Sequence, residues 1–167
     1  MNTRDIAETL ALLFGELVDG SQKSGGYMLN GGDAGLLGSL EKLAAPAASA
    51  TTQTGSSIAA HVDHVRYGLG LLNRWSAGEQ PDPFASADWS ASWRHRTVSE
   101  AEWRLLRDGL RDEASRWKEV LRTPRDIAPD DLRGFIGSIG HLAYHLGAIR
   151  QIDRTTRGPA EGDGITK

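Results

Sequence analysis

The sequence predicts an all-α protein. Its hydrophobic periodicity is helical wherever it is strong, and no window alternates apolar and polar residues as a half-buried strand does. The chain has 167 residues, of which 39% are hydrophobic and 25% are charged, so it suits one domain that buries its own core. We therefore expect a four-helix bundle over residues 1–154, with a short extra helix and a long irregular connection. A mobile tail over residues 155–167 should follow.

The first predicted helix covers residues 3–18. Its apolar residues share one face, and they are Ile6, Leu10, Leu13, Phe14 and Leu17. The pair Asp19-Gly20 should end it. A glycine-rich loop, SQKSGGYMLNGGD, then leads to the short helix near residues 34–43, and the small-residue stretch AAPAASATTQTGSS connects that helix to the next element.

The second long helix should span residues 56–75, with Ser56 or Ser57 as its N-cap. Its apolar stripe consists of Ile58, Val62, Val65, Leu69 and Leu72. His61 and His64 lie at the margin of this stripe. At about 100° per residue His61 falls closer to the centre than His64, so helical phase alone favours His61 as the inward histidine.

Residues 76–96 are too irregular for one helix and too aromatic for a flexible linker, so we expect them to pack across the bundle. A third helix should open at Ser99, where Ser99 and Glu102 have capping-box spacing, and close at Thr123-Pro124. The fourth should run from Pro129 to about residue 153. The chain's tryptophans should anchor the core or an interface, and they are Trp75, Trp89, Trp93, Trp103 and Trp117.

The fourth helix carries a His-x-x-x-His pair, His141 and His145, within HLAYHLGAIRQ. Residues four apart project from the same helix face, so both imidazoles can reach one metal ion. His64 is a candidate third ligand. Three neutral imidazoles would leave one coordination position open for water or substrate, as in catalytic rather than structural sites.

Composition narrows the possible ligands and partners. The chain has no cysteine, so a metal would have only nitrogen and oxygen ligands, and a reacting thiol would have to arrive with a substrate. The net charge of −3 argues against nucleic acid as a partner. No apolar stretch approaches the about 20 residues that span a bilayer, and acidic residues occur where a signal peptide would lack them, so we expect a cytoplasmic protein.

Several motifs resemble the DinB/YfiT-like metalloenzyme superfamily over most of the chain. SIAAHVDHV resembles that family's second-helix motif and places its metal-binding histidine at His64, while HLAYHLGAIRQ resembles the fourth-helix motif and gives His141 and His145. MLNGGDAGLLGSLEKL, RYGLGLLNRW and DWSASW resemble a less characterised branch. The resemblance, not the periodicity, favours His64 over His61. It implies a Zn²⁺ or Ni²⁺ site and either hydrolase or thiol S-transferase chemistry.

The expected function is therefore a metal-dependent enzyme acting on a small molecule, with water or a low-molecular-weight thiol as the activated nucleophile. His61 or Asp63 could serve as the base. Asp63, Asp153 or main-chain groups could hold the second ring nitrogen of a ligand. The alternatives are a metal- or small-molecule-binding bundle without turnover, and an interaction module that dimerises through its tryptophans.

Overall fold

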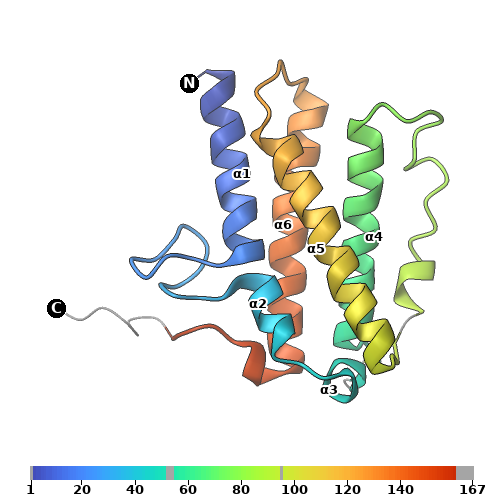
Figure 1. Cartoon of the computed structure of the whole chain (residues 1–167). Helices are drawn as coiled ribbons and strands as arrows, with labels where there is room; N and C mark the ends of the chain where they lie inside the picture. The colour runs from blue at the N-terminus through green and yellow to red at the C-terminus, as the bar shows by residue number, and fades with distance from the viewer. Residues whose placement is uncertain (1, 52–54, 95, 161–167) are drawn as a thin grey trace. The chain divides into compact units, whose positions relative to one another are not determined.

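The computed structural model describes residues 2–51, 55–94 and 96–160. These residues form six α-helices and two 3-10 helices, and none of them belongs to a strand (Figure 1). The all-α class is thereby confirmed. The chain divides into two compact units, one of residues 1–42 and 121–167 and the other of residues 43–120. The single domain expected over residues 1–154 stays a prediction.

In the first unit, helix α1 (Thr3–Asp19) contacts both α2 (Gly35–Glu41) and α6 (Pro129–Ile152). Asn2 and Asp5 form a capping box at its start, in which each side chain bonds the backbone N–H of the other residue. The predicted apolar face is the buried one at Leu10, Phe14 and Leu17. Sequence periodicity thus located this helix to within a residue.

The glycine-rich loop after α1 is held by one carboxylate. Glu16 is 7% exposed, and its carboxylate accepts hydrogen bonds from the backbone N–H groups of Tyr27 at 2.9 Å, Met28 at 2.8 Å and Leu29 at 2.6 Å. A Cβ atom on Gly26 would come within 2.0 Å of this carboxylate. A side chain at position 26 would therefore compete with the Glu16 carboxylate for the same space.

The end of α6 is tied to the same unit by Asp33. Arg150 donates to the Asp33 carboxylate at 2.6 Å, and both side chains are largely removed from solvent. Residues Arg154–Thr156 form the 3-10 helix η2, and Thr156 is buried. The expected mobile tail thus begins with residues that pack on the unit, whereas residues 161–167 lie outside the described part of the chain.

The second unit contains α3 (Ala45–Ser49), α4 (Ile58–Ser76), η1 (Ala91–Trp93) and nearly all of α5 (Glu100–Arg122). Ser57 caps α4 by accepting a hydrogen bond from the backbone of Ala60. Helix α3 lies in the stretch that the sequence predicted to be a connection. It is short and rich in alanine, but Ala45 and Ala48 are buried and the helix contacts α4.

Helix α5 begins at the predicted capping box, where Ser99 and Glu102 exchange hydrogen bonds. Trp103 is fully buried and donates its indole N–H to the carbonyl of Leu43 at 2.8 Å. Asn73 of α4 donates to the carboxylate of Glu113 at 2.7 Å, which joins α4 to α5. Trp103 is therefore a core anchor with a satisfied polar group, as buried indoles require.

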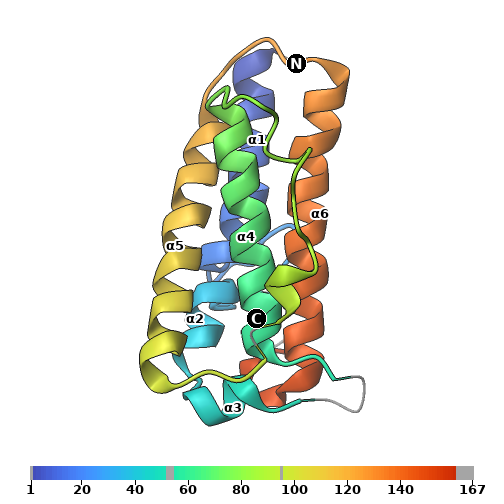
Figure 2. The same cartoon turned by 90° about the vertical axis from the view of Figure 1, so that its right-hand side faces the viewer.

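The tryptophan-rich segment between α4 and α5 folds back along α4, as Figure 2 shows. Helix η1 contacts α4, and the backbone N–H of Asp88 donates to the Tyr67 hydroxyl at 3.0 Å. This segment was expected to pack across the helices, and within its unit it covers α4. Across both units, no described helix is long and apolar enough to cross a membrane.

We predict that Glu16→Ala lowers the free energy of unfolding by about 3 kcal/mol, because three backbone N–H groups would lose a charged acceptor. Chemical denaturation would measure the loss. Hydrogen exchange should show faster exchange at the amides of residues 27–29, which the carboxylate holds.

The matched control is Glu8→Ala on the same helix, where Glu8 is exposed. Its effect should stay within about 0.5 kcal/mol. Equal effects of the two substitutions would contradict the clamping role of Glu16.

Candidate metal centre

The first part of the candidate centre is the histidine pair on α6. His141 and His145 lie one turn apart, and their Nε2 atoms are 2.9 Å apart. The two rings are perpendicular, with centroids 4.5 Å apart. His145 is 2% exposed, whereas His141 is only partly buried. The predicted spacing therefore places two potential ligand atoms close enough to bind the same ion.

The spacing of these nitrogens suits a shared ion. Two nitrogens bound to one divalent metal at about 2.0 to 2.1 Å stand about 2.8 to 3.4 Å apart when the angle between the bonds is near 90° to 110°. The observed 2.9 Å falls at the narrow end of this range. Without a metal, one Nε2–H must donate to the other Nε2, so ion binding replaces one proton.

The His141 imidazole is partly shielded from solvent. This partial burial lowers the pKa of the His141 imidazole below its usual value near 6.5, because the charged form loses solvation. The ring is therefore neutral near pH 7. Tyr144 packs edge-on against His145, with ring centroids 5.1 Å apart, and limits the positions that the His145 ring can take.

His64, the other predicted ligand, lies on α4 in the second unit. Its ring is 8% exposed and stacks on Trp93, with centroids 4.5 Å apart and planes inclined by 27°. Trp89 lies 5.6 Å away in a tilted arrangement. The His64 Nδ1 atom is 2.9 Å from the hydroxyl of Ser92. Trp93 thus sets the plane of the His64 ring, and Ser92 forms a hydrogen bond with its Nδ1 atom.

His61, the inward histidine by helical phase, is buried as well at 6% exposed. Its ring meets Trp93 edge-on at 5.2 Å, so His61 and His64 contact the same indole. Burial also lowers the pKa of His61. Phase does not separate the two residues, because the segment around η1 covers part of α4 that a simple amphipathic helix would leave to solvent.

Asp63 is buried and forms an ion pair with Arg66, whose guanidinium donates to it at 2.6 Å. Asp153 accepts from the backbone and hydroxyl of Thr155 at the start of η2. The expected hydrogen-bond partner for a ligand histidine is instead Ser92. Nothing in the periodicity of the sequence could have found it, since Ser92 lies in an irregular segment.

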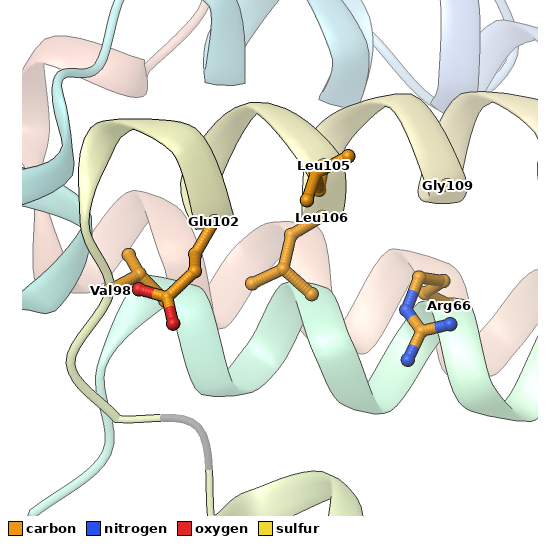
Figure 3. A pocket seen from close by; sticks show the side chains of 6 residues that line it. All are labelled: Arg66, Val98, Glu102, Leu105, Leu106 and Gly109. Atoms are coloured by element: carbon orange, nitrogen blue, oxygen red, sulfur yellow. The ribbon is translucent and has the colours of Figure 1, made fainter.

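A separate hollow of about 290 Å³ lies between α4 and α5 (Figure 3). Leu106 and Glu102 extend from α5 toward α4, where Arg66 lies. Its described lining is completed by Val98, Leu105 and Gly109, and includes none of the candidate histidines. Arg66, which lines the hollow, also forms the ion pair with Asp63, the residue before His64.

His64, His141 and His145 could together bind a metal ion, and each of the three offers a nitrogen ligand. The chain finds no match among protein-family models, curated proteins or solved structures.

Proposed function

We propose that this chain is a divalent-metal-dependent enzyme of the DinB/YfiT-like type, with His64, His141 and His145 as the metal ligands. The observation that carries the proposal is the 2.9 Å separation of the His141 and His145 Nε2 atoms. Two imidazoles held so closely on one helix are a natural bidentate site. The third ligand, His64, is supported by its burial and by the contact of its Nδ1 with Ser92.

A three-histidine set favours Zn²⁺ or Ni²⁺, since imidazole suits both ions and the chain supplies no thiolate. When bound, such an ion lowers the pKa of a coordinating water or thiol so that a nucleophile exists near neutral pH. The reaction would be hydrolysis with water, or S-transfer with a low-molecular-weight thiol. The substrate would be a small electrophile.

Among the candidate bases, His61 is better suited than Asp63. The imidazole of His61 is neutral near pH 7 because burial lowers its pKa, so a ring nitrogen can accept a proton from the nucleophile. The carboxylate of Asp63 is engaged by Arg66 at 2.6 Å and is better suited to orienting this stretch of α4. On α4, His64 would thus be a metal ligand, His61 the base, and Asp63 a residue that orients the helix.

We predict that protein purified without chelator binds Zn²⁺ or Ni²⁺ near one equivalent. His145→Ala and His64→Ala should each abolish stoichiometric binding, because a ligand contributes more than the about 10- to 100-fold that an outer partner does. Mass spectrometry of metal content and a competition titration with a chromophoric chelator would measure this.

The matched control is His61→Ala, which removes a similarly buried imidazole from the same helix. It should keep the metal and lose turnover of ester or thiol-acceptor substrates. Loss of metal from His61→Ala but not from His64→Ala would exchange the two roles. Full binding without turnover of either substrate class would favour a metal-binding bundle, and no metal after reconstitution would favour an interaction module.

We predict that metal affinity is nearly constant between about pH 7 and 8 and falls below about pH 6, because protons compete for the imidazole nitrogens. The lowered pKa of His141 keeps that ligand neutral to lower pH than an ordinary histidine. Titrations at stepped pH would measure the fall. Unchanged affinity down to about pH 5 would exclude imidazole ligands.

Stability should change in the same direction. Burial lowers the pKa of His61 and His141 in the folded protein, so the unfolded chain takes up protons first as the pH falls through about 6.5. The free energy of unfolding of the metal-free protein should therefore decrease on acidification in this range. Chemical denaturation of the metal-free protein, followed by circular dichroism at each pH, measures this decrease separately from any loss of metal.

A further inference from the structure

The hydroxyl of Ser92 stands between two groups on the same unit. It lies 2.9 Å from the carbonyl oxygen of Trp89 and 2.9 Å from Nδ1 of His64. Ser92 is 4% exposed and His64 is 8% exposed. In such a buried setting each polar contact must match a donor with an acceptor, because opposed lone pairs would cost more than the contact contributes.

For a neutral imidazole at His64, only one assignment of protons satisfies both contacts. A carbonyl oxygen cannot donate, so the single hydroxyl proton of Ser92 must be directed at Trp89. The Ser92 oxygen is then an acceptor toward His64, and the proton in that second contact must reside on Nδ1. A neutral imidazole with its proton on Nδ1 carries its lone pair on Nε2.

We propose that Ser92 is a positioning residue that holds His64 in the Nδ1–H tautomer and so presents Nε2 to the metal. Its connection to metal binding rests on the proposed function, whereas the choice of tautomer does not. The hydrogen bond from Nδ1 also makes Nε2 a stronger donor to a metal, as the outer partners of ligating histidines do. The Trp89–Ser92 turn would be the device that selects the ligand atom.

The stacked indole completes this arrangement. Trp93 lies against the face of the His64 ring, with 4.5 Å between centroids, and fixes the plane in which the ring lies. Stacking alone does not distinguish the ring from its copy turned by about 180°, since either face can meet the indole. Ser92 makes that distinction, because only one edge of the ring then meets the hydroxyl. The two residues therefore have separate effects on His64.

The test is the tautomer of His64 in metal-free protein, read from long-range ¹⁵N–¹H correlations of the imidazole. Wild type and Ser92→Thr, which keeps a hydroxyl, should show the Nδ1–H form. Ser92→Ala should shift His64 to a mixture or to the Nε2–H form. A wild-type Nε2–H form, or an Nδ1–H form that persists unchanged in Ser92→Ala, would overturn the proposal.

Metal titration of the same variants supplies a second readout. Ser92→Ala should weaken Zn²⁺ binding by about 10- to 100-fold, whereas Ser92→Thr should stay within a few-fold of wild type. The matched control is Ser90→Ala in the same turn, whose exposed hydroxyl donates to Asp88 rather than to a histidine. Ser90→Ala should alter neither the tautomer nor the affinity, and an equal effect at both serines would overturn the proposal.

The two readouts separate the two levels of inference. If wild type binds no metal yet its His64 tautomer depends on Ser92, the proposed function fails and the positioning role of Ser92 stands. If metal binds at the three histidines and the tautomer ignores Ser92, the positioning role fails alone. Circular dichroism spectra and thermal unfolding of each variant show whether the fold is kept.

Discussion

A buried imidazole needs a partner for the nitrogen that carries its proton, and this requirement organises the second unit around α4. The segment that folds back from the end of α4 supplies a hydroxyl and an indole to His64, and the same indole to His61. Without that segment His64 would lose both the hydroxyl bonded to its Nδ1 and the indole stacked on its ring. The irregular connection therefore determines what the histidines of α4 can do.

The helices followed from the sequence because each combines a periodic apolar stripe with a local boundary signal. The capping pair Ser99 and Glu102 and the proline at position 129 mark the starts of α5 and α6 as expected. The sequence did not predict helix α3, because its alanine and serine residues show little hydrophobic contrast from one position to the next. The sequence also did not predict the hydrogen bonds that the Glu16 carboxylate accepts. The backbone donors lie 11 to 13 residues away, and no periodic pattern relates positions so far apart.

In the candidate centre too, some features follow from local sequence and others do not. The pairing of His141 with His145 is a property of one helical turn, so spacing was sufficient to predict it. The environment of His64 is made by contacts across 28 residues, with Ser92 at the far end. Helical phase ranked His61 above His64 because it assumes one buried face, whereas η1 covers α4 as well. Long-range packing, not local pattern, gives each of these histidines its surroundings.

The approach of Glu16 to Gly26 links two positions that are ten apart in the chain. Because a Cβ at position 26 would meet the carboxylate at 2.0 Å, any larger residue there is incompatible with glutamate at position 16 in this conformation. The two positions should therefore change together during sequence divergence. A side chain at position 26 would have to displace the Glu16 carboxylate, and the three backbone amides would then need other acceptors.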